Sequence, residues 1–315
     1  MVNLIKNENM KIYRRVRTWV MIGLLVLLVG AASFIIWFED GRHIASGDWR
    51  AQLEQQIEND NQFLKESGLA DQTKQQVQHQ ITKAVYQLEH DIKPLEGTMW
   101  GAVSNLTGFV MLISLFVVIV AGDTLANEFS TGTIKLLLIR PASRTKILIS
   151  KYVACVLFGI LLLFVLFIVS FLANGALYGF GGWTDPYLKV DDAGTVLEKS
   201  MILYVWSDYL FSAVSAIMYV TISFMISAVF RSSAMAIGIS IFTMFVASEL
   251  LTVLLYRYEW SKFLLFPNMN LKVYLEGIPY KEGMTMGFSI SVLLVYFVVI
   301  NLLTWLVFTK RDVAT

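Results

Sequence analysis

Residues 126–151, ANEFSTGTIKLLLIRPASRTKILISK, form a short basic segment between two long apolar runs, and this arrangement governs the interpretation of the whole chain. The segment contains five cations and one carboxylate, Glu128. The flanking runs are long enough to cross a hydrocarbon core of roughly 30 Å at a rise of about 1.5 Å per residue. We therefore expect a loop on one face of a membrane, joining two transmembrane helices.

The composition of the whole chain is typical of a membrane protein. Hydrophobic residues make up 56% of its 315 residues and charged residues only 16%, and the mean hydropathy is +0.62. The runs long enough to span a membrane are residues 19–38, 99–121, 152–172, 209–230, 234–256 and 286–308. The sequence thus predicts an all-α, polytopic membrane protein with six transmembrane helices.

The distribution of charge predicts that both termini are cytoplasmic. With the N-terminus inside, the inner segments carry an excess of Lys and Arg and the outer segments an excess of carboxylates. The first run contains small residues typical of a signal-cleavage site, but the apolar stretch FIIWF follows them, which favours a retained helix. We expect a multi-pass protein of the plasma membrane of a bacterial cell.

These spans divide the chain into segments of distinct expected character. They are an N-terminal amphipathic segment with the first span (1–38), an extracytoplasmic helical hairpin (39–98), the second span with the basic cytoplasmic loop (99–151), the third span with an outer Gly- and aromatic-rich loop (152–208), the fourth and fifth spans (209–256), an outer interfacial or re-entrant segment broken near Pro267 (257–285), and the sixth span with a cytoplasmic tail (286–315).

The hairpin is expected because apolar residues recur at helical spacing on both sides of the stretch SGLAD. In that stretch Gly68 is suited to end one helix and Asp71 to cap the next. Two antiparallel helices packed along one apolar stripe satisfy this pattern. The hairpin could be a stiff cap over the outer mouth, or it could bind a substrate or a partner.

Residues suited to catalysis or metal binding are scarce. Cys155 is the single cysteine, so the chain forms no intramolecular disulfide, and the three histidines have no cysteine companions for a zinc site. The chain lacks a G-x-x-x-x-G-K-[ST] phosphate loop. We therefore expect neither an enzyme nor a cofactor bound by this chain.

Glu249 is the formal charge deepest in any of the apolar runs. An intramembrane carboxylate is either a functional site or a side chain that reaches the outer interface or a neighbouring helix. A lone acid makes a poor proton relay, because ion-coupled transport uses several polar groups at the midplane. Energy for any transport is therefore expected to come from another protein.

Within the basic segment, local signals predict a helix break followed by a short helix. Gly132 interrupts the helix leaving the second span, Thr131 can cap a new turn over residues 133–139, and Pro141 ends that turn. Ser143 can cap the helix that becomes the third span. The apolar face of the short helix could meet a groove on a cytoplasmic protein, or its cations could meet anionic lipid.

The stretch NEFSTGTIKLLLIRPASRTKILISK resembles the signature of permease subunits of the ABC-2 type of ATP-binding-cassette transporters. The matching positions are Glu128, Gly132, Thr133, Leu137, Leu138, Pro141, Ser143, Arg144 and Lys151. The N-terminal stretch NLIKNENMKIYRRVR, with Glu8 and Lys11, resembles the amphipathic start of such subunits. The terminal FTKRDV resembles their ending.

The resemblance implies a permease subunit that exports an amphipathic substrate, such as a peptide antibiotic, a drug or a lipid. It would pair with itself or a similar chain, and two copies of a cytoplasmic ATPase would bind ATP and Mg beneath it; lipid but no nucleic acid would be a partner. The short helix would be the coupling helix, with Glu128 and Arg144 stabilising its bent geometry. The ATPase-coupling residues so implied are Glu128, Gly132, Thr133, Ile134, Lys135, Leu137, Leu138, Pro141, Ser143 and Arg144.

Two other functions stay open on the residues alone. A membrane sensor or scaffold would bind a ligand or partner with its outer hairpin and signal through its inner loops. A secondary transporter gated by Glu249 would depend on that carboxylate and on an ion gradient.

Overall fold

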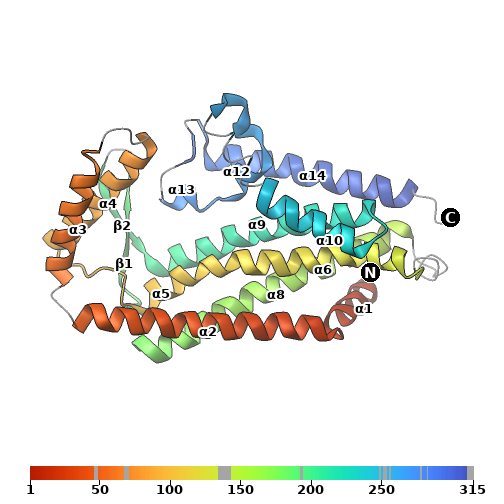
Figure 1. The fold of residues 1–315 in the computed structure, drawn as a ribbon, viewed down its shortest axis with the longest axis horizontal. Helices are drawn as coiled ribbons and strands as arrows, with labels where there is room; N and C mark the ends of the chain where they lie inside the picture. Colours follow the sequence, from red (N-terminus) through yellow and green to blue (C-terminus); the bar gives the residue numbers. More distant parts are fainter. Residues whose placement is uncertain are drawn as a thin grey trace.

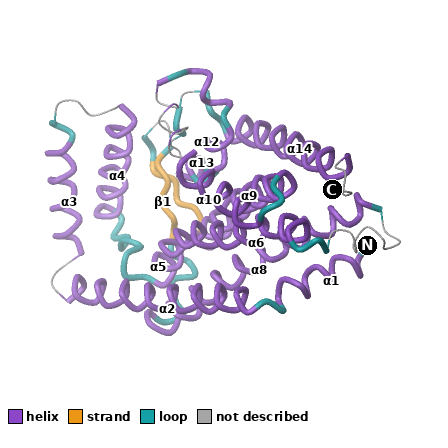
Figure 2. Tube along the Cα trace, turned by 45° about the vertical axis from the view of Figure 1, so that its right-hand side comes forward, coloured by secondary structure: helices purple, strands orange, loops and turns teal. Residues whose placement is uncertain are grey.

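The structure is a computed structural model, and it describes residues 1–45, 49–66, 71–133, 143–191, 194–247, 250, 254, 257–276, 279–281 and 283–310. Most of these residues are helical (Figure 1). The long helices run side by side along the longest dimension of the molecule, and short elements gather at its two ends (Figures 1 and 2).

Five helices are long and apolar enough to cross a membrane in the part of the chain that the structure describes. They are α2 (Val16–Ala45), the continuous Met99–Ser130 helix, α8 (Arg144–Tyr178), α9 (Met201–Val229) and α14 (Met286–Lys310). The Met99–Ser130 helix consists of α5 (Met99–Asn105), the 3₁₀ turn η1 (Leu106–Phe109) and α6 (Val110–Ser130). Each of the five coincides with a span predicted from the sequence.

The fifth predicted span, residues 234–256, is not recovered at full length. Its described part is a shorter apolar helix, Ser233–Val246, made of α10 (Ser233–Phe242) and the start of the π-helix η2 (Thr243–Ala247). Glu249 lies outside the described residues. A count of six spans is therefore not confirmed.

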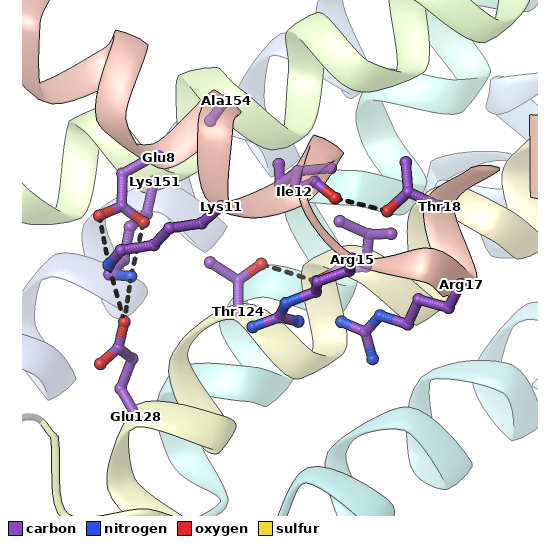
Figure 3. Close-up of a pocket in the computed structure, with 11 residues that line it drawn as sticks. Glu8, Lys11, Ile12, Arg15, Arg17, Thr18, Thr124, Glu128, Lys151 and Ala154 are labelled. Carbon is purple, nitrogen blue, oxygen red and sulfur yellow. Dashed lines mark hydrogen bonds and ion pairs between the residues drawn. The ribbon is translucent and has the colours of Figure 1, made fainter.

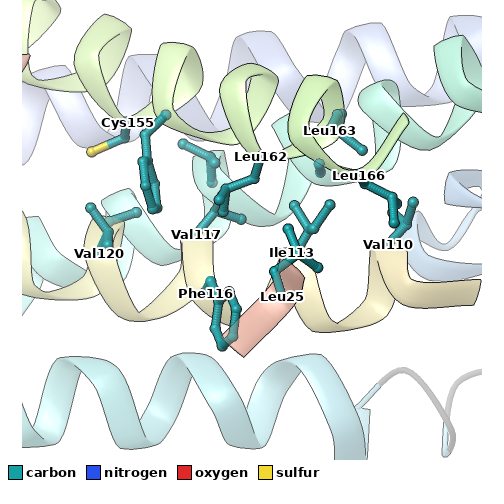
Figure 4. Close-up of a cluster of buried hydrophobic side chains, with 14 of the residues drawn as sticks. Leu25, Val110, Ile113, Phe116, Val117, Val120, Cys155, Leu162, Leu163 and Leu166 are labelled. Atoms are coloured by element: carbon teal, nitrogen blue, oxygen red, sulfur yellow. The ribbon is translucent and has the colours of Figure 1, made fainter. Parts of the chain in front are cut away.

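The core lies where α6 packs between α8 and α9. Leu162 and Leu166 of α8 meet Ile113 and Val117 of α6, and all four are fully buried (Figure 4). Gly159 allows this close approach, since a Cβ there would lie 3.2 Å from Val117. Burial of this kind stabilises by roughly 25 cal/mol per Å² in water, whereas in a bilayer the contribution comes mainly from close packing.

Serine hydroxyls join α6, α9 and α10. Ser223 of α9 donates to the Val118 carbonyl at 2.8 Å and lies 3.0 Å from the hydroxyl of Ser240 on α10. Ser227 Oγ accepts from the backbone N–H groups of Leu125 and Ala126, both at 3.0 Å. Small polar residues let the helix backbones approach and satisfy one another's hydrogen bonds without water.

The two ends of the bundle differ in character. At one end lies α1 (Val2–Tyr13), beside the starts of α2 and α8 and the end of α14, where the Arg144 guanidinium donates to the Thr309 carbonyl at 3.0 Å (Figure 1). At the other end lie α3 (Trp49–Phe63) and α4 (Asp71–Glu89), packed side by side, with a two-stranded sheet against α4 (Figures 1 and 2).

That sheet corrects the all-α prediction. Strand β1 (Pro186–Val190) pairs antiparallel with β2 (Val196–Ser200) in the segment predicted as an outer Gly- and aromatic-rich loop. Asp191 closes the turn, because its carboxylate accepts from the Thr195 N–H at 2.8 Å. Gly194 supplies a backbone φ of +79° that other residues rarely adopt. Tyr187 stacks on Tyr204 of α9 with ring centroids 3.6 Å apart, which anchors the sheet to the bundle.

The segment before α14 consists of short helical pieces: η3 (Glu259–Phe263), α12 (Leu265–Met269) and α13 (Val273–Glu276). Pro267 lies in the first turn of α12, where a missing N–H costs nothing, so the break precedes it, at Leu264. The fully buried Asn268 donates to the Lys262 and Leu264 carbonyls and accepts from Ser289 of α14 at 2.6 Å. These bonds hold the segment against α14.

Candidate functional site

Four alternating charges form a closed ring at the end of the bundle that holds α1 (Figure 3). The Lys151 ammonium lies 2.8 Å from Glu8 and 2.9 Å from Glu128. The Lys11 ammonium lies 2.8 Å from Glu8 and 3.1 Å from Glu128. Because these residues belong to α1, α6 and α8, the ring ties three helices together. We call these four residues the charged ring.

Three of the four side chains of the charged ring are largely withdrawn from solvent. The side chain of Lys151 is 1% exposed, and those of Glu8 and Glu128 are 10% and 13% exposed. A buried charge is costly unless it is paired, and here each cation has two carboxylates. Burial by itself lowers the pKa of Lys11, but its hydrogen bonds and ion pairs with Glu8 and Glu128 outweigh burial, so that this pKa is raised. The Lys11 ammonium therefore stays charged at neutral pH.

Tertiary pairing, rather than local helix stability, explains the position of Glu128. A carboxylate in the last turn of a helix opposes the helix dipole, and Glu128 is two residues from the end of α6 at Ser130. Glu8 and Lys11 are three positions apart on α1, which places both on the face directed toward α8. The position of Glu128 is therefore favourable only when α1, α6 and α8 are packed together.

A second cluster of charges lies beside the ring, centred on Asp123 of α6. Arg15, in the turn between α1 and α2, and Arg17, in the first turn of α2, both donate to its carboxylate. The hydroxyl of Ser233 donates to the other carboxylate oxygen. Asp123 is 4% exposed, and it connects the start of α2 and the start of α10 to α6.

Between the two clusters is a cavity of only about 20 Å³. Its lining includes the charged ring, Arg15, Arg17 and Thr124 (Figure 3). A volume of this size holds about one water molecule. The two clusters therefore form a closely packed ionic junction between the helices, with room for about one water molecule.

The predicted coupling residues are only partly within the described chain. The helix ends where expected, because α6 stops at Ser130 and Gly132 has a φ of +72°. The Thr133 hydroxyl donates to the Glu128 carboxylate, which folds the chain back onto the ring. Ser143 caps α8 by accepting from the Lys146 N–H at 3.3 Å. Outside the described residues lie Ile134, Lys135, Leu137, Leu138 and Pro141.

Two further contacts involve predicted residues. The hydroxyl of Thr131 donates back to the Asn127 carbonyl at 2.7 Å, and the turn that Thr131 was expected to cap continues outside the described residues. Arg144 donates to the Thr309 carbonyl and so joins the start of α8 to the end of α14. The sequence analysis did not predict the Asp123 cluster. The available signal was Asp123 itself, a carboxylate two residues after the end of the predicted second span.

Comparison with known proteins gives a family and two relatives. The family model described as "Protein of unknown function (DUF2705)" matches residues 71–314. "Uncharacterized protein YhcI" of Bacillus subtilis (strain 168) is 40% identical over 317 residues, and the match covers 100% of both chains. "Uncharacterized membrane protein YdbK" of the same organism is 29% identical over 215 residues, covering 68% of this chain and 82% of the relative.

Proposed function

The chain belongs to the DUF2705 family, and we propose that it is the membrane-spanning permease subunit of an ABC-2 type transporter. It exports an amphipathic substrate, and a separate cytoplasmic ATPase binds and hydrolyses the ATP. The apolar helices, together with a relative named as a membrane protein, support a location in the membrane. The resemblance of residues 126–151 to the ABC-2 signature motivates the choice of transporter class.

The charged ring is the observation that carries the proposal. Residues 134–142 lie between the end of α6 and the start of α8, and both of these helices contribute to the ring. Any force applied to this connection reaches α6 and α8 directly. It reaches α1 through Glu8 and Lys11 as well. A rigid ionic junction at this position suits a subunit whose helices are moved by a protein docked below.

The course of the chain supports a sixth span and cytoplasmic termini. Helix α10 begins at the Asp123 cluster, whereas α13 lies at the opposite end, where Lys189 of β1 donates to the Tyr274 carbonyl at 3.0 Å. The chain between them therefore has to pass from one end of the bundle to the other. The cations at the α1 end support a cytoplasmic location for that end by the positive-inside rule.

Outward apolar faces leave room for lipid and for a second permease chain. Leu27 of α2 is 64% exposed, and Leu294 and Val295 of α14 are 58% and 63% exposed. Apolar surface of this extent is stable only against hydrocarbon or another helix. A dimer with itself or a similar chain would place such faces against each other and form the path for the substrate.

The test is a gentle purification of the C-terminally tagged chain from native membranes, followed by mass spectrometry. A protein with a phosphate-binding loop, recovered at one copy per permease chain, is the expected result. A tagged Glu54→Gln variant, changed at an exposed carboxylate of α3, should recover the ATPase as the unmodified chain does. Recovery of the chain without any such ATPase would contradict the proposal.

One observation favours the second candidate, a sensor or scaffold. A cavity of about 240 Å³ lies between α3, α4 and β1, and Gln56, Gln80, Gln87 and Lys83 line it. Amide and ammonium groups around a cavity could hold a polar ligand. In that case a change such as Gln80→Leu would alter signalling to a cytoplasmic protein, and no transport would depend on ATP.

A further inference from the structure

A polar recess lies beside the 3₁₀ turn in the second long helix. This turn, η1, joins α5 to α6 without interrupting the helix, and a 3₁₀ stretch inside a helix often marks a functional hinge. The recess has a volume of about 170 Å³. Its polar lining comes from η1, α9 and the segment before α13, and consists of Thr107, Asp208, Ser212, Ser215, Asn270 and Lys272.

Asp208 is a buried carboxylate with unused acceptor capacity. Its side chain is 1% exposed, and it lies in the apolar helix α9. One oxygen accepts from the Lys272 ammonium at 3.0 Å. The other oxygen, Oδ1, is buried and has no hydrogen-bond partner among the described residues. An ionised carboxylate can accept about four hydrogen bonds, so Asp208 can hold a second cationic group besides Lys272.

Neighbouring groups of the recess also offer acceptors. The Ser215 hydroxyl donates to the Met269 carbonyl at 2.6 Å, which leaves its lone pairs available. The Asn270 amide nitrogen donates to the Tyr280 hydroxyl at 2.8 Å, which leaves the amide oxygen as an acceptor. Three acceptors around one small space match the three N–H donors of a primary ammonium group.

An apolar groove of about 440 Å³ adjoins the recess, and Gly108 lines both. The groove is formed by α2, η1, the start of α6 and η2, with Leu28, Phe109, Met111, Leu115 and Phe245 in its walls. Polar recess and apolar groove together make one amphipathic site. Its shape suits a ligand with a charged head and a hydrocarbon tail.

We propose that this site binds a cationic amphiphile, with its ammonium group at Asp208 and its alkyl chain in the groove. The inference rests on the proposed transport function and narrows its substrate class from amphipathic molecules to cationic amphiphiles. Binding to the purified chain can nevertheless be measured without ATP or an ATPase. The unpaired Oδ1 of Asp208 and the neighbouring oxygens of Ser215 and Asn270 select a head group with several N–H donors, and the groove selects against small hydrophilic amines.

Gly108 provides a variant that blocks the site with little effect on folding. It is exposed, and a Cβ at this position would meet nothing within 4 Å. Gly108→Leu therefore fills the junction of recess and groove while leaving the Asp208–Lys272 pair intact. Gly23→Leu on α2, which is also exposed and meets nothing within 4 Å, is the matched control.

The experiment measures binding of radiolabelled dodecylamine to the purified chain in a non-ionic detergent. Unlabelled dodecylamine, dodecanol and dodecyl sulfate serve as competitors. We expect saturable binding that only dodecylamine displaces efficiently. Asp208→Asn and Gly108→Leu each weaken the affinity by about tenfold or more, as expected for loss of one charge-assisted bond or of the tail site. Gly23→Leu and Glu54→Gln bind as the unmodified chain does.

Three results would overturn the site: no saturable binding, equal displacement by dodecyl sulfate, or unchanged binding in both Asp208→Asn and Gly108→Leu. Size-exclusion profiles establish that each variant is folded. If Asp208→Asn does not fold, the Gly108→Leu result decides. If dodecylamine binds but no ATPase co-purifies, the binding site is supported and the permease proposal is wrong. If an ATPase co-purifies but dodecylamine does not bind, only the proposed substrate class is wrong.

Discussion

Replacing Lys151 by Met should release α1 from the bundle. The Lys151 side chain is 1% exposed and contacts both carboxylates of the charged ring, at 2.8 and 2.9 Å. Methionine has a similar length and fits an apolar surrounding, so the change removes the charge with little loss of volume. Glu8 and Glu128 then face each other across Lys11 alone, whose side chain is 42% exposed.

The magnitude follows from the burial of these groups. Breaking a fully buried ion pair by removing one partner costs about 3 to 5 kcal/mol. The lower value applies here, because the two carboxylates keep some contact with solvent and Lys11 still pairs with both. About 3 kcal/mol corresponds to a roughly 100-fold larger population in which α1 is detached.

Hydrogen exchange of the α1 amides, Val2–Tyr13, reports that population directly. We expect exchange to accelerate roughly 100-fold in Lys151→Met while the amides of α9 keep their protection. The matched control is Lys6→Met, since Lys6 is an exposed lysine of α1 outside the ring. Equal exchange in Lys151→Met and Lys6→Met would instead show that α1 is held by its apolar contacts alone.

Three further predictions concern the same end of the bundle. Gly132→Leu forces a branched side chain into a φ of +72°, at a cost of about 1 to 2 kcal/mol, and should lower ATP-driven transport without reducing membrane insertion, whereas Gly23→Leu should not. Leu137→Asp should reduce co-purification of the ATPase, as expected if the apolar face of the predicted coupling helix docks there; undiminished recovery would place docking elsewhere. Because the pKa of Lys11 is raised above 10.5 in the folded protein, its ion pairs contribute fully to the stability of the α1 contact at any pH below the pKa of the unfolded chain. This contribution is lost only as the pH rises through the pKa of the folded protein. Protection of α1 should therefore be constant from about pH 6 to about pH 9, and a decline within that range would contradict the assignment.

The long helices could be predicted because span length and hydropathy are local properties of the sequence. Helices α8 and α14 contain their predicted spans, and α14 begins at the predicted residue, Met286. The β1–β2 hairpin was missed because its strands are short and lie in a loop rich in glycine and aromatic residues. The available signal was the turn-forming stretch DDAG at residues 191–194, between two short apolar stretches.

The site was only partly predictable, because its contacts join distant parts of the chain. Glu8, Lys11, Glu128 and Lys151 were each noted in the sequence, but their ring depends on how α1 lies across α6 and α8. Asp208 precedes the predicted fourth span by one residue, so its burial was not foreseen. Helix α9 begins at Met201, directly after β2, so Asp208 lies within the helix and not before it.

The central claim is that a separate ATPase moves this chain through the junction of α1, α6 and α8. Hydrogen exchange of the purified complex, with and without ATP, Mg and vanadate, tests that claim most directly. We expect that nucleotide changes the protection of α1 and of the last turns of α6, and that Lys151→Met uncouples α1 from this response. Identical exchange at these elements in both states, in a complex that hydrolyses ATP, would contradict it.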